Sequence, residues 1–424
     1  METWKKNLIV CWVGVFATMI GTSQIAPVLP VYIEQLGVHS QAEIVRWAGI
    51  IFGSTFILMA SVAPLWGKAA DKYGSKLMLL RSSLGMAIIL SAMAFAQNVY
   101  HLAGLRFLQG TISGFYSAAI TLTASQTPPA KTGWALGILS TGAVTGSLLG
   151  PLIGGYLAEI MGIRSVFLAI GTSLLFAFLL SFFFVKEDRS TVTRKKTAAP
   201  SWRSLPNKNM IMAMFITCFV LQGALFSIQP VITVYVQKLA GNISHIVLIS
   251  GMVFAAPGLA ALFTAPAIGR LIDKKGPEKI IIISLIFSAL SFIPQVTAST
   301  HWELMGYRFL MGLVSAGLLP ATNTYLKLVV PGEVLGSIYG YSQSAQFIGA
   351  FFGTLIGGEA AARFGAEYAF IFAGVLLFLN ATWVYFKVYN ARENVGGKTY
   401  CKKFFPQTPF LKTLAVGASS GPNC

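Results

Sequence analysis

The stretch that decides the fold is GKAADKYG at residues 67–74, because the chain repeats it as GRLIDKKG at residues 269–276. A second stretch, GLRFLQG at 104–110, recurs as GYRFLMG at 306–312, again 202 residues later. A third match, at a shift of 203 residues, joins Gly146, Gly150, Gly154, Gly155, Gly162, Phe167 and Gly171 to Gly349, Gly353, Gly357, Gly358, Gly365, Phe370 and Gly374. Chance does not hold one register over three motifs. The sequence therefore predicts two halves with the same fold and the same orientation.

The composition places these halves in a membrane. The 424 residues are 55% hydrophobic and only 11% charged, with mean hydropathy +0.69. Soluble proteins are about 25% charged, and disordered proteins need low hydrophobicity, so both classes are excluded. Apolar segments of about 20 residues recur, each long enough to cross a hydrocarbon core of about 30 Å as a helix. We expect an all-α membrane protein whose twelve spans lie at about 8–35, 46–66, 77–97, 101–124, 134–160, 164–185, 209–237, 245–268, 279–298, 302–325, 334–361 and 367–389.

The basic residues predict the orientation. The net charge is +17, which in a soluble protein would suggest nucleic acid. Most of the lysines and arginines fall in the segments that share a side with both termini, so we place that side in the cytoplasm. The first span follows Lys5 and Lys6 but is too long for a signal peptide, and we expect it to be retained. The predicted organisation is an N-terminal six-helix bundle (1–185), a cytoplasmic linker (186–208), a C-terminal six-helix bundle (209–389) and a basic, disordered cytoplasmic tail (390–424).

The repeated loop motif predicts a gate. Its glycines permit tight turns, and its aspartate can accept hydrogen bonds from the N-terminus of a neighbouring helix. Such a clasp would hold one face closed and release it on protonation or motion. An ordinary basic loop is the alternative, which the repetition disfavours. The predicted gating residues are Gly67, Asp71, Lys72, Gly74, Lys76, Gly269, Asp273 and Gly276.

Two arginines lie within predicted spans, where charges are costly and usually functional. Arg106 lies about five residues into the fourth span, and Arg308 is its counterpart in the tenth. The functional reading pairs Arg106 with a carboxylate or a polar backbone group. The alternative is an arginine that extends toward the membrane interface. For Arg308 the two readings are balanced.

Two spans carry motifs of small residues and proline. In the fifth span Gly146, Gly150, Pro151, Gly154 and Gly155 form a flat stripe that predicts close helix contact and a bend at the proline. In the first span Pro27 and Pro30 predict a kink. Glu34, near its outer end, is a candidate for proton coupling if half-buried; an interfacial glutamate is the alternative.

Several absences narrow the function. The sequence has no phosphate-binding loop of the form GxxxxGK[ST], and its four cysteines lack CxxC spacing, so we expect no ATP drive, metal or cofactor. The four histidines fall at predicted outer rims, and Glu159 and Glu359 lie in outer parts of their spans. A missing deep carboxylate beside two arginines favours neutral, zwitterionic or anionic substrates. We expect a transporter and not an enzyme.

Together these motifs resemble the major facilitator superfamily. The stripe ending in GPLIGG at 150–155 is similar to the antiporter motif of drug exporters, and PVLP at 27–30 is similar to the first-helix motif of twelve-helix drug–proton antiporters. The segments YIEQLG at 32–37, KLMLLRS at 76–82 and GWALG at 133–137 look like the MdtG-type branch of bacterial multidrug exporters. The resemblance spans about residues 4–390. Lys68 and Ser75 depart from the family pattern in the inner clasp.

The resemblance implies drug efflux driven by inward proton flow in a bacterial cell membrane. Asp71 would then be the clasp carboxylate, Arg106 the arginine linked to proton transfer, and Gly150 with Pro151 the bend between the halves. The residues expected to line the cavity are Gln24, Phe115, Tyr116, Gln229, Phe254, Asn323, Tyr341, Gln346 and Phe347. We expect helices 1, 4, 5, 7, 8, 10 and 11 around it, small drug-like partners, protons and lipids, no nucleic acid, and a monomer.

Two other functions stay open at this point. A specific carrier of an organic anion or a sugar-like solute would use Arg106 and Arg308 as substrate ligands. A membrane sensor or scaffold that does not transport is the more remote alternative.

Overall fold

The computed structural model describes residues 2–187, 208–241, 245–330 and 334–389. Within these ranges the regular structure is helical, and no strand occurs. The predicted linker (186–208) and tail (390–424) lie mostly or wholly outside the described residues. For Asp71, the backbone is described as helical but the side chain is not.

The N-terminal half crosses from the end that carries Lys5, here called the basic end, to the opposite end and back. Successive crossings are antiparallel because short loops connect them. The helices are α1 (Thr3–Ser23), α2 (Ile25–Gln35), α3 (Gln41–Tyr73), α4 (Ser75–Met93), α5 (Val99–Ile112), α6 (Phe115–Gln126), the 3-10 turn η1 (Pro129–Lys131), α7 (Thr132–Met161) and α8 (Ile163–Phe184).

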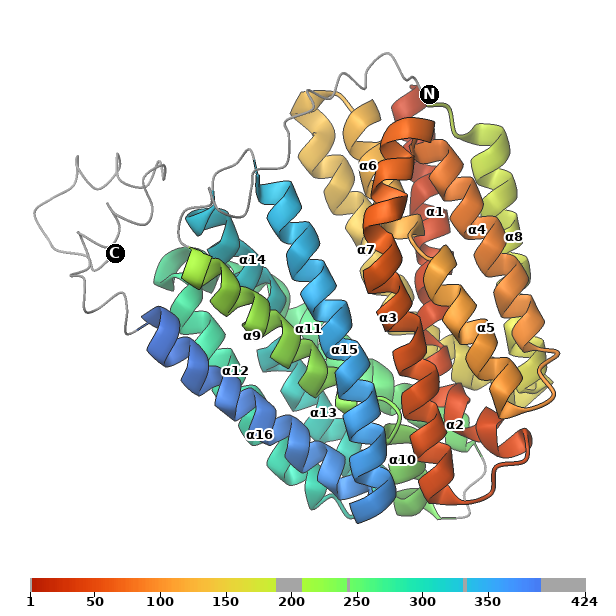
Figure 1. The fold of residues 1–424 in the computed structure, drawn as a ribbon, viewed down its shortest axis with the longest axis vertical. Helices are drawn as coiled ribbons and strands as arrows, with labels where there is room; N and C mark the ends of the chain where they lie inside the picture. The colour runs from red at the N-terminus through yellow and green to blue at the C-terminus, as the bar shows by residue number, and fades with distance from the viewer. Residues whose placement is uncertain (1, 188–207, 242–244, 331–333, 390–424) are drawn as a thin grey trace, which may run out of the picture.

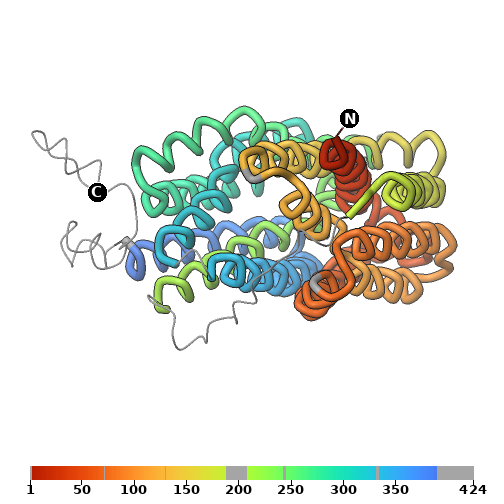
Figure 2. Tube along the Cα trace, turned by 90° about the horizontal axis from the view of Figure 1, so that it is seen from above, coloured from red at the N-terminus to blue at the C-terminus, as the bar shows by residue number. Residues whose placement is uncertain are grey.

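The C-terminal half repeats this order. Its helices are α9 (Lys208–Ser227), α10 (Ile232–Ala240), α11 (Ile246–Lys275), α12 (Pro277–Val296), α13 (His301–Ser315), α14 (Leu318–Val329), α15 (Leu335–Phe364), α16 (Ala366–Val384) and the short η4 (Tyr385–Tyr389). Seen from above, the two halves form two clusters side by side (Figure 2).

Ten helical segments of the described chain are long and apolar enough to cross a membrane. The other two crossings are the α5–α6 pair, which is broken, and α15, which is rich in glycine, serine and glutamine. The prediction of an all-α membrane fold is confirmed.

Four predicted spans are interrupted: the first, the fourth, the seventh between Ser227 and Ile232, and the tenth between Ser315 and Leu318. The fourth span breaks at Ser113 and Gly114, where Gly114 has φ 130°. The first breaks at Gln24, three residues before Pro27. Pro27 has no N–H to donate to the carbonyl one turn earlier, so the helical bonding is interrupted in the turn before the proline, while Gln24 keeps helical backbone angles.

The repeat is visible in the backbone. Gly74 and its counterpart Gly276 both join two helices with positive φ, 93° and 85°. Gly162 and Gly365, the equivalent pair at the opposite end, have φ of 78° and 111°. Residues with a side chain rarely adopt this conformation, so each glycine fixes a tight reversal between successive spans.

Glycines also set the closest helix contacts within each half. A methyl group at Gly357 of α15 would overlap the carbonyl oxygen of Ser227 in α9. On α7, a Cβ at Gly146 would lie 2.6 Å from the carbonyl oxygen of Phe16 in α1. In lipid, small residues allow backbones to approach and gain van der Waals contact.

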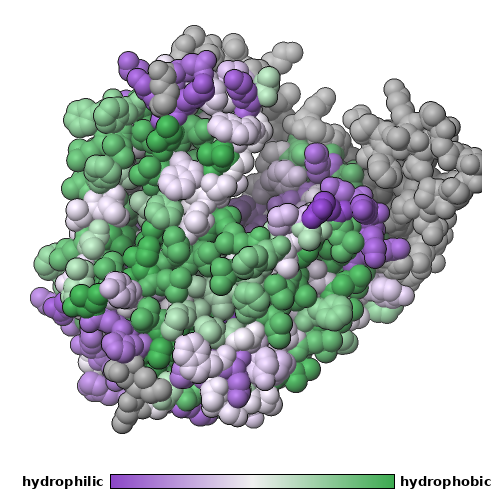
Figure 3. Space-filling view, turned by 180° about the vertical axis from the view of Figure 1, so that it is seen from behind, coloured by the Kyte–Doolittle hydropathy of each residue, from purple (hydrophilic) through white to green (hydrophobic). Residues whose placement is uncertain are grey.

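Between the halves, α3 packs on α15 and α7 packs on α11. The halves converge at the end opposite the N-terminus and separate toward the basic end (Figure 1). Apolar side chains cover the middle of the molecule and polar ones gather at its two ends (Figure 3).

The α9–α15 contact gives a first prediction. Gly357→Val should destabilise the folded protein by about 1–3 kcal/mol, because the added atoms meet backbone that cannot move aside. Thermal unfolding of the purified protein in detergent measures this. The matched control is Gly104→Ala, whose added methyl group meets open space and should leave stability unchanged or slightly raised. Equal effects of the two substitutions would contradict the packing argument.

Candidate functional site

A central cavity of about 800 Å³ lies where the two halves face each other. The N-terminal half supplies most of its wall from α1 to α7, and the C-terminal half adds a few residues from three segments. Apolar and aromatic side chains predominate, with hydroxyl and amide groups among them. The aromatic cluster Phe56, Phe226 and Phe347 joins both halves at ring-centroid distances of 4.9 and 6.4 Å.

Five of the nine predicted cavity residues lie on this wall: Phe115, Tyr116, Gln229, Phe254 and Phe347. The other four do not. Gln24 is fully buried at the α1–α2 break against Gly154, and Gln346 is buried and accepts a bond from the Gln222 amide at 3.3 Å. Asn323 and Tyr341 are exposed, on α14 and α15. No described residue of α13 or α14 lines the cavity, whereas α3 and α4 do, so the expected place of helix 10 is wrong in this conformation.

Arg106 is buried on the cavity wall with its charge facing an amide. Its Nη1 donates to Gln109 Oε1 at 2.6 Å, and its guanidinium lies 5.6 Å from the Phe52 ring. The Arg106 carbonyl oxygen accepts from the Thr55 hydroxyl at 3.0 Å, which joins α5 to α3. Among the described residues no carboxylate pairs with this arginine. A buried cation without a counter-charge is costly, and the Arg106 Nε has no hydrogen-bond partner among the described residues.

Arg308 occupies the equivalent position in the C-terminal half, where it bonds to the backbone of a neighbouring helix. Its Nε donates to the carbonyl oxygen of Val253 at 2.9 Å. Pro257, four residues further along α11, has no N–H, and the Val253 carbonyl therefore has no helical donor. Gly312, one turn after Arg308, packs directly against Pro257. Arg308 is not on the cavity wall, so the structure favours helix packing for it.

Arg81 is a cavity residue that the sequence analysis did not single out. Its guanidinium stacks 3.5 Å from the Trp66 ring, and its Nη2 donates to the Ser113 carbonyl at 3.1 Å. The Trp66 indole donates to the Thr111 carbonyl at 2.6 Å. Both side chains satisfy carbonyls that the α5–α6 break leaves free. The sequence signal for a cavity role is a single arginine at the seventh residue of α4. Composition alone counts it among the basic residues of the cytoplasmic side.

The glycine stripe of α7 divides between two partners. Gly146, Gly150 and Gly154 pack on α1 within the N-terminal half. Gly155 and Pro151 instead face α11 of the other half: a Cβ at Gly155 would lie 2.8 Å from the Val247 carbonyl oxygen. The stripe therefore joins the two halves as well as two helices of one half.

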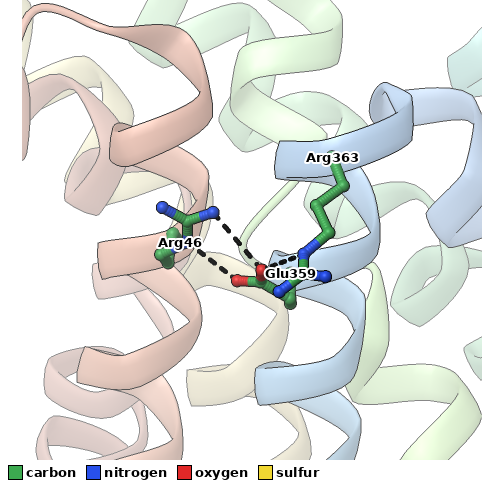
Figure 4. Close-up of polar contacts among 3 residues, drawn as sticks. All are labelled: Arg46, Glu359 and Arg363. Atoms are coloured by element: carbon green, nitrogen blue, oxygen red, sulfur yellow. Dashed lines mark hydrogen bonds and ion pairs between the residues drawn. The ribbon is translucent and has the colours of Figure 1, made fainter.

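An ion pair closes the end opposite the basic end. Arg46 of α3 donates to both oxygens of Glu359 in α15, at 2.7 and 3.3 Å, and Arg363 contacts the same carboxylate from one turn away (Figure 4). Beneath this pair a Cβ at Gly49 would lie 2.6 Å from the Thr354 carbonyl oxygen. The two helices thus meet backbone to backbone, with the charges at the rim.

A second bridge closes the same end on the other side. Glu159 of α7 accepts from the backbone N–H of Leu248 at 3.0 Å and contacts the His245 imidazole, both at the start of α11. Leu248 is the repeat counterpart of Arg46, 202 residues later. The two bridges join equivalent helix pairs, but their glutamates are not repeat counterparts: at the shift of 203 residues Glu159 corresponds to Ala362 and Glu359 to Tyr156.

The gating motifs lie at the open, basic end, and the contacts of their described side chains stay within one half. Asp273 and Lys72 are exposed. Lys76 donates to the Phe182 carbonyl of its own half at 3.0 Å, and Glu187 accepts from the Ser75 and Lys76 N–H groups at 2.8 and 3.0 Å. Gly67, which lines the cavity, and its counterpart Gly269 face open space.

Two further pairs of glycines at this end have no neighbour within 4 Å among the described residues. They are Gly133 and Gly137 of α7 and their counterparts Gly336 and Gly340 of α15. Their helices use glycines for tight contact at the opposite end. The basic end therefore carries small, flat glycine surfaces that contact no other described helix in this conformation.

The residues expected to couple protons are not brought together. Glu34 is exposed at the far end of α2, whereas Arg106 is buried. Asp71 lies sixteen residues along α3 from Thr55, which contacts Arg106, or about 24 Å by helix rise. The described cavity wall contains Arg81 and Arg106 but no carboxylate, and no cluster of metal-ligating side chains occurs in the described ranges.

The closed end gives a second prediction. Glu359→Gln removes the charge that holds Arg46 and should shift the protein toward opening at this end. A cysteine at Thr354, which is buried beneath the pair, should then react faster with a thiol reagent in a background without the native cysteines. Arg363→Gln is the control, because it leaves the bond between the halves intact. A reaction rate unchanged by Glu359→Gln would contradict the proposed closure.

The sequence profile of the Major Facilitator Superfamily matches residues 11–249 and 242–419. Multidrug resistance protein MdtG of Proteus mirabilis (strain HI4320) is 42% identical over 390 residues, which cover 91% of this chain and 97% of that protein. MdtG of Salmonella schwarzengrund (strain CVM19633) is 45% identical over 378 residues, covering 88% and 94%.

Solved structures share the fold at low identity. A bacterial homologue of the human lysosomal transporter Spinster, in an inward-facing and occupied conformation, has a TM-score of 0.77 at 14% identity and covers 96% of this chain and 100% of that chain. The nucleoside transporter NupG has a TM-score of 0.74 at 13% identity, covering 91% and 99%. These two likenesses concern the fold alone.

Proposed function

Because this chain belongs to the Major Facilitator Superfamily, we propose that it exports drugs and other small amphipathic molecules across the cell membrane in exchange for protons. The observation that carries this proposal is the cavity between two repeated halves, closed at one end by the Arg46–Glu359 and Glu159–Leu248 bridges and open at the other. The relatives that share 42–45% of its residues are named multidrug resistance proteins. It is a transporter of the multi-pass membrane class.

Alternating access follows from the internal repeat. Two halves related by a repeat can rock about a site at their interface, so that either end opens in turn. In the structure the cavity opens toward the basic end, which the distribution of lysine and arginine assigns to the cytoplasm. The drug would enter from the cytoplasm or inner leaflet, and the Arg46–Glu359 and Glu159–Leu248 bridges would part to release it outside.

The cavity suits varied amphipathic ligands. Aromatic faces such as Phe56, Phe254 and Phe347 accept apolar groups, and Gln229 and Gln343 offer amides. Arg81 and Arg106 make the described wall cationic, which favours neutral, zwitterionic or acidic compounds over polycations. The same charge supports the second candidate function, a carrier of an organic anion. Its ligands would be Arg81 and Arg106, since Arg308 is engaged by Val253.

For proton coupling we propose a central part for Arg106. Its partner in this conformation is the neutral Gln109, so its charge is free to meet an acidic group in another state. Asp71 remains a candidate for the clasp at the basic end. Glu34, at the far end and exposed, is a poor candidate. A single chain with both halves fused is proposed to work as a monomer.

The two buried arginines give a third prediction. Arg308→Met should lower the free energy of unfolding by about 1–3 kcal/mol, because the Val253 carbonyl is left unpaired. Arg106→Met should instead remove efflux per molecule while the fold survives. Thermal unfolding and drug efflux, normalised to protein in the membrane, measure the two effects. The reverse pattern would contradict the roles assigned here.

Transport itself gives a fourth prediction. In inverted vesicles that hold an acidic interior, addition of substrate should release protons, seen as recovery of a quenched pH probe. An ionophore that collapses the gradient should abolish substrate uptake, and Arg106→Met should abolish both signals. Uptake that persists without a gradient would refute proton coupling. Uptake of acidic solutes only would establish the organic-anion carrier instead.

A further inference from the structure

A second hollow lies between α1 and α7 at the basic end. This α1–α7 groove has a volume of about 340 Å³ and is lined by Lys5, Leu8, Ile9, Trp12, Trp134 and Ile138. It shares no lining residue with the central cavity. The drug pathway described above therefore does not account for it.

The groove wall is apolar apart from Lys5. Ile9 is 53% and Trp134 is 61% exposed, on α1 and α7 respectively. The one polar atom of Trp12, its indole N–H, donates to the Thr141 hydroxyl at 3.0 Å. Trp12 therefore presents only ring carbon to the groove. Such a wall fits a hydrocarbon chain and offers nothing to a polar solute.

The mouth of the groove is basic. The ammonium groups of Lys5 and Lys131 lie 5.5 and 5.8 Å from the ring of Trp4, which meets Trp134 edge-on at 6.4 Å. The carboxylate at this mouth is Glu2, 2.9 Å from Lys5. A hydrogen bond from Lys5, the charge of Lys5 and, more weakly, the charge of Lys131 hold the pKa of Glu2 below its usual range.

These positive charges exceed the negative one. Lys5 and Lys131 oppose Glu2 among the described residues at the mouth, which therefore keeps an excess of one positive charge. A cationic mouth beside an apolar groove fits a ligand with a negative head and a long apolar tail. Basic pockets between transmembrane helices bind the head groups of anionic lipids in this way.

We propose that the α1–α7 groove binds an anionic phospholipid, with its phosphate at Lys5 and Lys131 and an acyl chain along Ile9, Trp12, Trp134 and Ile138. The lipid would contact the turn of α7 that presents Gly133 and Gly137 to the open end. The site is separate from the drug cavity and does not depend on the transported substrate.

Native mass spectrometry of the full chain in detergent tests the proposal. Phosphatidylglycerol or phosphatidylcholine is titrated, and the lipid-bound fraction gives each affinity. The wild type should bind phosphatidylglycerol about tenfold or more tightly than phosphatidylcholine. The double variant Lys5→Gln/Lys131→Gln should bind both lipids equally. Ile138→Trp, which fills the groove without a change of charge, should weaken phosphatidylglycerol binding as well.

The matched control is Lys274→Gln/Lys275→Gln, which removes two exposed lysines from the same end of the other half. It should keep the preference of the wild type. Thermal unfolding of each variant excludes loss of fold as the cause. Equal loss in both double variants would show a general charge effect and overturn the site. Displacement of the lipid by millimolar inorganic phosphate would overturn the role of the acyl chain.

Discussion

The structure depends on the backbone contact between the two halves at the closed end. There α3 meets α15 and α7 meets α11, and glycines at the crossings let carbonyl groups approach side chains and backbone of the partner. The core of a bilayer holds no water, so the apolar surfaces of the two halves gain nothing from being removed from water. Packing and a few bonds between the halves must therefore hold the closed end together. Glu159 and Glu359 supply those bonds from α7 and α15. The two bridges join helix pairs that correspond under the repeat, and each half contributes one of the glutamates.

The open end is the counterpart of this closed end. Gly67, Gly133 and Gly137, with their repeat counterparts, face open space on the same helices that cross tightly at the far end. A flat surface without a partner is unusual inside a membrane bundle, and it is explained if these surfaces meet in the opposite conformation. The gating loops belong to this surface without contacts, and Asp273 and Lys72 are therefore exposed in this conformation.

Some of this was predictable from sequence. The repeat, the spans and the stripe of Gly146 to Gly155 follow from spacing and hydropathy, which are local properties. The break at Gly114 was missed because no proline marks it and its free carbonyls are satisfied by Arg81 and Trp66 from other helices. The role of Arg308 was undecided because it depends on a carbonyl freed by Pro257 in another span. The Arg46–Glu359 pair links residues 313 positions apart, and nothing in either segment predicts the other.

One measurement tests the central claim that the halves rock about this cavity. Spin labels at Lys72 and Ser337 report the distance between the basic ends of α3 and α15, and labels at Gln41 and Phe364 report the opposite ends. Double electron–electron resonance with and without substrate and acid should show reciprocal changes, the first distance shortening as the second lengthens. Two distances that stay fixed, or that change in the same direction under every condition, would contradict the account.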